Sequence, residues 1–237
     1  MGIQIAYKCK PLIKDTVILR STEDGVYSHS SEPTLINVTI DGGNYGIATS
    51  TSGTVTAINC TIRNMKLYDV SSADTDVILI NTSFNHSKTT FPAGRNSIIV
   101  KWYLHVYVED SNHVPISGAN VRIRDNDNGT YDENFTTDGN GYVRWIVLTE
   151  YTQTDKNGDE DGNDPGEIVY YTPYNITVSY DNLNFTDNPR ESEINRSKTE
   201  VFRATSALPE FGSVWVAVIF VMLLVVVRRA LSRNRAL

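Results

Sequence analysis

The stretches "INVTI" (residues 36–40), "INCTI" (58–62) and "INTSF" (80–84) repeat one short pattern, and "IKDTVI" (13–18) precedes them in the same register. A second phrase, glycine followed by an apolar residue, recurs between them at residues 2–3, 25–26 and 46–47. A fixed period in the twenties is typical of a solenoid. The repeated stretches are short, β-branched and alternating, so each turn of the solenoid should be built from strands. The polar members of the first pattern are 22 residues apart: Asp15, Asn37, Asn59 and Asn81.

These phrases resemble the right-handed parallel β-helix family, whose coils carry an apolar residue, Asn, a variable residue and Thr-Ile, followed by Gly-Ile. The resemblance implies a mainly β fold, with a parallel β-helix over residues 1–96 and coils about 4.8 Å apart. The repeat is already in register at Gly2, and a solenoid needs a cap because an open coil exposes unpaired strand edges. We therefore expect this chain to be the C-terminal part of a larger surface protein, or a sequence with a late start.

The register places Asn37, Asn59 and Asn81 above one another, which allows two roles for these side chains. If they point into a turn, each amide can hydrogen-bond to the equivalent residue one coil away, forming the asparagine ladder known from β-helix proteins. If they point outward, three glycans would leave the surface about 4.8 Å apart, a spacing narrower than a branched sugar. We expect the ladder, with glycosylation as the alternative.

The acceptor pattern for N-glycosylation in secreted proteins, Asn-x-Ser/Thr without proline in the middle, occurs nine times in the chain. Three of these asparagines are the ladder positions. The others lie in irregular turns or outside the repeat and are the predicted glycosylation sites: Asn85, Asn128, Asn134, Asn175, Asn184 and Asn195. This high number of acceptor patterns predicts an extracellular glycoprotein.

The β-helix family includes polysaccharide lyases and hydrolases, which group several carboxylates on one face across adjacent coils. In this chain the acidic residues up to residue 69 share no phase at a period of 22, and Asp74 with Asp76 lies on one loop. The four histidines have no metal-ligand spacing. Cys9 and Cys60 are out of phase with the coils, so two free thiols are expected. The sequence therefore predicts no catalytic residues.

From residue 97 the period ends and longer strands follow, beginning with "SIIVKWYLHVYVED" (97–110). Asp-Gly and Asn-Gly pairs at residues 138–141 should supply the positive φ that a tight hairpin needs. Val143, Trp145 and Val147 alternate with polar residues, as on a strand with one buried face.

Two motifs of this region, "PISGANVRI" (115–123) and "TDGNGY" (137–142), resemble the Ig-like β-sandwich of the carboxypeptidase-regulatory or transthyretin-like type. The resemblance covers residues 97–205. It implies a spacer or binding platform without catalysis.

The acidic stretch "TDKNGDEDGNDPGE" (154–167) lies between two strands of this module. Asn157, Asp159 and Asp161, followed by glycine, have the alternating oxygen ligands of a calcium loop. An EF-hand loop starting at Asn157 would need glutamate at position 168, where Ile168 stands, and no helix is expected on either side. A solvated acidic turn is the main interpretation, with weak calcium binding as the alternative; no other cofactor is predicted.

The C-terminal region, residues 206–237, contains fourteen apolar residues at 214–227. As a helix they would cover about 21 Å of a hydrocarbon core of about 30 Å. The run is apolar on every face, unlike a core helix, and basic residues just past such a run stay in the cytoplasm. The pattern predicts one transmembrane helix with an extracellular body and a cytoplasmic tail, which carries Arg228, Arg229, Arg233 and Arg235.

The motif just before this segment has five residues: Leu208, Pro209, Glu210, Phe211 and Gly212. With the short apolar helix and the basic tail, it resembles the Pro-Glu-Phe sorting signals of archaeal surface proteins. The resemblance implies an archaeal source and an archaeosortase-like enzyme that cuts near the motif and attaches a lipid anchor. A retained single-pass helix is the alternative, because the tail after the apolar run is longer than in that family.

The formal charge of the chain is -7, and since the tail carries +4, residues 1–210 carry -11. Such an acidic body argues against nucleic acid and against docking on anionic lipid. We therefore expect a membrane-anchored surface glycoprotein with a structural or adhesive role, whose partners are the membrane, a processing enzyme and surface glycans. The alternative is the C-terminal part of an extracellular β-helix protein that binds or degrades polysaccharide.

Overall fold

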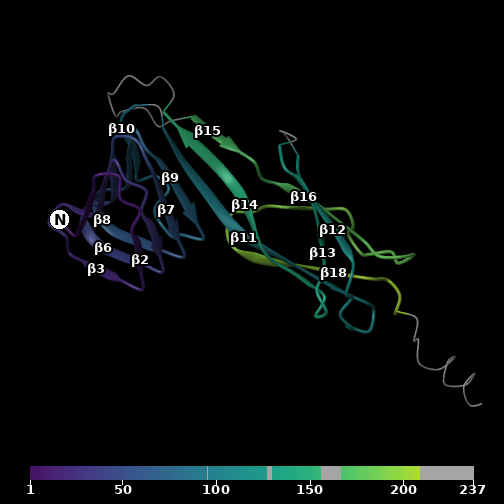
Figure 1. Cartoon of the computed structure of the whole chain (residues 1–237). Coiled ribbons are helices and arrows are strands. Elements are labelled where there is room, and N and C mark those ends of the chain that lie inside the picture. Colours follow the sequence, from purple (N-terminus) through teal and green to yellow (C-terminus); the bar gives the residue numbers. More distant parts are fainter. Residues whose placement is uncertain (95, 127–129, 156–166, 209–237) are drawn as a thin grey trace, which may run out of the picture.

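The computed structural model describes residues 1–94, 96–126, 130–155 and 167–208. The regular secondary structure of these residues consists of the strands β1 to β18, without a helix. The strands form a solenoid at the N-terminal end and two facing sheets beyond it (Figure 1). The fold of the described residues is therefore mainly β, as the sequence predicts.

One side of the solenoid is a six-stranded parallel sheet in which β1, β4, β6, β8 and β10 are neighbours in that order and β3 pairs with β6. Equivalent residues of successive coils lie side by side, Ile18 beside Ile40 and Ile40 beside Ile62, and all three are buried. The bounds of the strands are β1 (Ile3–Ala6), β3 (Val17–Leu19), β4 (Asp24–His29), β6 (Thr39–Ser50), β8 (Thr61–Ala73) and β10 (Thr89–Ala93).

The other side of the solenoid is also a parallel sheet, in which Leu35, Ala57 and Leu79 pair in turn and are fully buried. The sequence period of 22 residues is therefore the length of one coil. The predicted parallel β-solenoid is confirmed, with about four turns. The strands of this side are β2 (Leu12–Lys14), β5 (Thr34–Ile36), β7 (Thr54–Ile58) and β9 (Asp76–Ile80).

The glycines of the second repeated phrase lie where neighbouring coils pack closely. A Cβ added to Gly46 would lie 2.3 Å from Cγ2 of Ile62 and 2.5 Å from the carbonyl oxygen of Asp69. At Gly25 the corresponding distance, to Cγ2 of Ile40, is 2.2 Å. Because atoms cannot approach so closely, any larger residue would force the coils apart, which explains the recurrence of glycine.

The strand β11 (Ser97–Glu109) belongs to both parts of the molecule. Its first residues pair in parallel with β9, with Ile98 beside Val77. Further along the same edge, β11 pairs in parallel with β18 (Lys198–Arg203). On its other edge, β11 pairs antiparallel with β14 (Tyr142–Thr154) from Ser97 to Tyr107, and β15 (Glu167–Tyr170) extends the sheet beyond β14. One eight-stranded sheet thus runs through the predicted boundary at residues 96 and 97 without a linker (Figure 1).

A separate four-stranded sheet faces the far part of this long sheet, and hydrogen bonds join the two. The Tyr174 hydroxyl donates to the carbonyl of Thr149 at 2.9 Å. Arg190 and Ser192 donate to the Glu200 carboxylate at 3.1 and 2.7 Å. The second part of the chain is therefore a β-sandwich. Its smaller sheet has the order β13 (Asp132–Thr136), β12 (Asn120–Asp125), β16 (Tyr174–Ser179) and β17 (Arg190–Ser192).

The turn at residues 138–141 differs in one detail from the expectation of two glycines with positive φ. Gly141 has a φ of 76°, and a Cβ there would lie 2.6 Å from the carbonyl oxygen of Val108. Gly139 is not in the positive-φ region. Asp138 closes the turn, since its N–H donates to the carbonyl of Tyr142 at 2.8 Å, and of the two glycines only Gly141 has a positive φ.

Among the described residues, no helix has the length and apolar character that crossing a membrane requires. The predicted transmembrane helix at residues 214–227 lies outside the described part of the chain.

Candidate functional site

The predicted ladder residues lie at one corner of the solenoid, directly after β5, β7 and β9. The N–H of Asn37 donates to the carbonyl of Ile58 at 2.9 Å, and that of Asn59 donates to Ile80 at 2.9 Å, so the corner residues hydrogen-bond from coil to coil. The corner residues all have a left-handed backbone conformation, which Asn and Asp tolerate better than most residues. Its φ values run from 46° to 54° at Asp15, Asn37, Asn59 and Asn81.

Side chains at this corner also form hydrogen bonds between coils. Asn37 Nδ2 donates to Asp15 Oδ1 at 2.7 Å, and Asn81 Nδ2 donates to Asn59 Oδ1 at 2.8 Å. Asn81 Oδ1 accepts a hydrogen bond of 2.8 Å from the hydroxyl of Ser197, which directly precedes β18. The corner therefore links neighbouring coils and connects the last coil to the sandwich.

The predicted glycosylation sites are spread over the molecule. Asn85 is exposed on the solenoid, while Asn134 and Asn175 lie on the two strands that flank β12, the first exposed and the second half-buried. Asn184 and Asn195 are exposed in loops of the sandwich. The sixth site, Asn128, lies outside the described residues.

Two of the predicted sites fall largely outside the described part of the chain. They are the calcium loop, with Asn157, Asp159 and Asp161, and the sorting motif from Pro209 to Gly212. The first motif residue is described: the N–H of Leu208 donates to Oδ2 of Asp110 at 2.9 Å, at the end of the sandwich. Within the described ranges, no three His, Cys, Asp or Glu side chains are grouped so that they could hold a metal ion.

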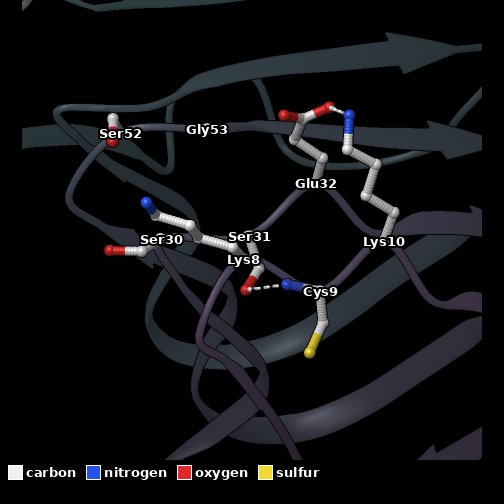
Figure 2. A pocket seen from close by; sticks show the side chains of 8 residues that line it. All are labelled: Lys8, Cys9, Lys10, Ser30, Ser31, Glu32, Ser52 and Gly53. Carbon is white, nitrogen blue, oxygen red and sulfur yellow. Dashed lines mark hydrogen bonds and ion pairs between the residues drawn. The ribbon is translucent and has the colours of Figure 1, made fainter.

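A hollow of about 400 Å³ lies at another corner of the solenoid, where the turns of three coils meet. Lys10 and Glu32 form an exposed ion pair of 2.7 Å across it, and the N–H of Cys9 donates to Oγ of Ser31 at 3.3 Å (Figure 2). The hollow offers hydroxyl groups and charges to a polar ligand, but no aromatic ring. It is lined by Lys8, Cys9, Lys10, Ser30, Ser31, Glu32, Ser52 and Gly53.

The cysteines are both free, as predicted: Cys9 is exposed and Cys60 is buried. Burial raises the pKa of the Cys60 thiol, which keeps it protonated. The thiol packs in the solenoid, where its Sγ accepts a hydrogen bond of 3.4 Å from the N–H of Val38. Cys60 is therefore a core residue of the coil.

The outer face of the sandwich carries a group of rings that no motif in the sequence indicates. Three of them stand at alternate positions of β11 and two come from β14, and none points into the core. Tyr107 and Tyr142 lie with ring centroids 4.5 Å apart, and the Arg144 guanidinium lies 4.2 Å above the Tyr142 ring. We call this surface the aromatic face and define it by Tyr103, His105, Tyr107, Tyr142 and Trp145.

Trp145 reaches this face because of a β-bulge. Val106 pairs with Val143 and Leu104 pairs with Ile146, so that two residue steps on β11 oppose three on β14. The extra residue, Trp145, has a φ of 62°. A bulge of this kind shifts the alternation of inward and outward side chains by one position.

The expectation that Val143, Trp145 and Val147 share the buried face is therefore wrong. Val143 is buried, but Trp145 is 65% exposed and Val147 is 37% exposed. Beyond the bulge the inward positions are taken by Ile146 and Leu148. The strict alternation of apolar and polar residues predicts that Trp145 is buried. Nothing in the local sequence indicates the bulge that exposes it.

His105 supports the bulge from the neighbouring strand. Its Nδ1 accepts a hydrogen bond of 3.2 Å from the backbone N–H of Trp145. Burial, followed by the positive charge of Arg144, lowers the pKa of His105. A neutral ring with an unprotonated Nδ1 is the form that can accept this hydrogen bond, so the electrostatics and the geometry agree.

Comparison of the chain with protein-family models, with curated proteins and with solved structures found no match.

Proposed function

We propose that this chain is a membrane-anchored extracellular surface glycoprotein with a structural or adhesive role. The observation that best supports the proposal is the continuous sheet through β9, β11 and β14, which joins solenoid and sandwich without a linker. The segment after β18 runs to the end of the sandwich far from the solenoid (Figure 1), and its last described residue, Leu208, hydrogen-bonds to Asp110. An anchor after Leu208 would hold the solenoid away from the membrane.

The finer parts of the proposal rest on the sequence. The solenoid belongs to the right-handed β-helix class, the sandwich is Ig-like, and the six predicted asparagines outside the ladder carry glycans. Residues 208–212 and the following apolar run act as an archaeal sorting signal, cut and replaced by a lipid in most molecules. C-terminal peptide analysis of protein from native membranes distinguishes this from a retained helix, since only the latter yields peptides spanning residues 211–227.

A deletion tests the anchor. The full chain and a variant that lacks residues 209–237 should be produced in cells of the source organism, and the membrane and medium assayed for each. The full chain is expected in the membrane fraction and the shortened chain in the medium. If both are found in the same fraction, residues 209–237 are not the anchor and the proposal fails.

The second candidate function, polysaccharide binding, is favoured by one observation, the exposed aromatic face. Binding requires no catalytic residues.

A further inference from the structure

The aromatic face combines exposure with backbone strain in a way that packing does not explain. A tryptophan in the left-handed conformation costs on the order of 1–3 kcal/mol, a cost that proteins tend to retain at functional sites. At position 145 the residue gains little burial in return, because it is 65% exposed. A glycine would fit the same φ without strain. The tryptophan side chain is therefore kept at this position for what it offers to the outside.

The rings around Trp145 leave its indole open to a ligand. Tyr103 approaches at a centroid distance of 5.3 Å and an interplanar angle of 88°, and His105 at 4.8 Å and 80°. Both contacts are T-shaped, so neither ring lies parallel to the indole. The two neighbours orient the indole, and Trp145 remains 65% exposed, so much of its surface is open to a ligand.

Polar groups surround this apolar surface. The Arg144 guanidinium and the tyrosines of the face can donate hydrogen bonds, and Thr199 on β18 is exposed beside His105. A sugar ring has complementary chemistry: its C–H groups form an apolar face that stacks on an aromatic ring, and its hydroxyls at the rim need hydrogen-bond partners. A mostly apolar protein partner would leave these donors without partners, which costs affinity.

We propose that the aromatic face is a carbohydrate-binding platform on which the Trp145 indole stacks against a pyranose ring of a cell-envelope or extracellular polysaccharide. Arg144 and the tyrosine hydroxyls bind the sugar hydroxyls at the rim. The inference rests on the proposed surface location in one respect: that location makes the bound glycan one of the cell envelope or the extracellular space.

The binding test uses the full chain and soluble hexasaccharides of glucose, N-acetylglucosamine and mannose at millimolar concentration, with calorimetry as the readout. At least one sugar should bind, and Trp145→Gly should weaken that binding about tenfold or more. Trp145→Tyr, which keeps a ring, should retain part of it. Tyr7→Ala is the matched control, since Tyr7 is 87% exposed on the solenoid and far from this face along the chain; it should bind as the wild type does.

Melting temperature separates loss of the platform from loss of the fold. Because glycine suits a φ of 62°, Trp145→Gly should melt at or above the wild-type temperature. The proposal is overturned if none of the hexasaccharides binds, or if Trp145→Gly binds as tightly as the wild type.

Isolated cell envelopes distinguish a glycan from a protein partner. Protease treatment of the envelopes removes protein partners and leaves polysaccharide in place, so the Trp145-dependent binding of the chain to envelopes should survive it. Binding that protease treatment abolishes indicates a protein partner and refutes the glycan. A surface-anchored chain without sugar binding would refute this inference alone, and a sugar-binding chain found inside the cell would refute the proposed surface role alone.

Discussion

At Asn59 the backbone and the side chain place separate demands on the residue. The φ of 54° favours Asn or Gly, and Oδ1 accepts the hydrogen bond from Asn81. Asn59→Gly should lose only the hydrogen bond, about 0.5–1.5 kcal/mol of unfolding free energy. Asn59→Ala should lose about 1 kcal/mol more, since its Cβ opposes the left-handed conformation. Urea denaturation of chains made in a bacterial host, without glycans, measures both. Equal losses for the two variants would show that the corner places no demand on φ.

His105 should make the stability of the bulge depend on pH. Its pKa is lowered in the folded state, mainly by burial, while in the unfolded chain it is about 6.5. At pH values between the folded and the unfolded pKa of His105, the unfolded state binds more protons than the folded state. The contribution of His105 to the free energy of unfolding therefore rises with pH across this range and is lost as the pH falls.

The measurement for this prediction compares the wild type with His105→Gln in urea. The stability advantage of the wild type should be larger at neutral pH than at mildly acidic pH, because protonation removes the acceptor for the Trp145 N–H. An advantage that grows on acidification would contradict the assigned protonation state.

At the scale of the elements, the spacing between coils depends on small residues at β4 and β6. Gly46→Ala would place a Cβ 2.5 Å from the carbonyl oxygen of Asp69, and backbone cannot move aside as a side chain can. We expect a loss of about 1–3 kcal/mol. Gly139→Ala is the control, since a Cβ there meets no atom within 4 Å, and it should change stability by less than about 0.5 kcal/mol. Similar losses for both variants would contradict close packing as the reason for the repeat.

The elements also differ in how far the sequence predicts them. The solenoid was predictable because stacking repeats the same environment every coil, so that Ile18, Ile40 and Ile62 report one buried position. The bulge was not predictable, because alternation is a local signal and the extra residue, Trp145, reverses which side chains of β14 face inward beyond it. The pairing of β11 with β18 was also not predictable from the sequence, because it joins residues 94 positions apart, such as His105 and Thr199.

At the scale of the whole molecule, the predicted glycans should follow the geometry of the surface. Asn37, Asn59 and Asn81 occupy one corner, where Asn59 and Asn81 are joined by a hydrogen bond, while Asn134 and Asn184 are exposed elsewhere. Glycopeptide mass spectrometry of native protein should find the three corner asparagines mostly bare and the other two occupied. Full occupancy at the corner would contradict the predicted ladder.

The surface location of the body is tested most directly by protease treatment of intact cells of the source organism, followed by mass spectrometry of the released peptides. An anchored surface protein should release peptides from the solenoid and the sandwich, residues 1–208, before the cells are lysed. The same peptides appearing only after lysis would place the body inside the cell and contradict the proposed function.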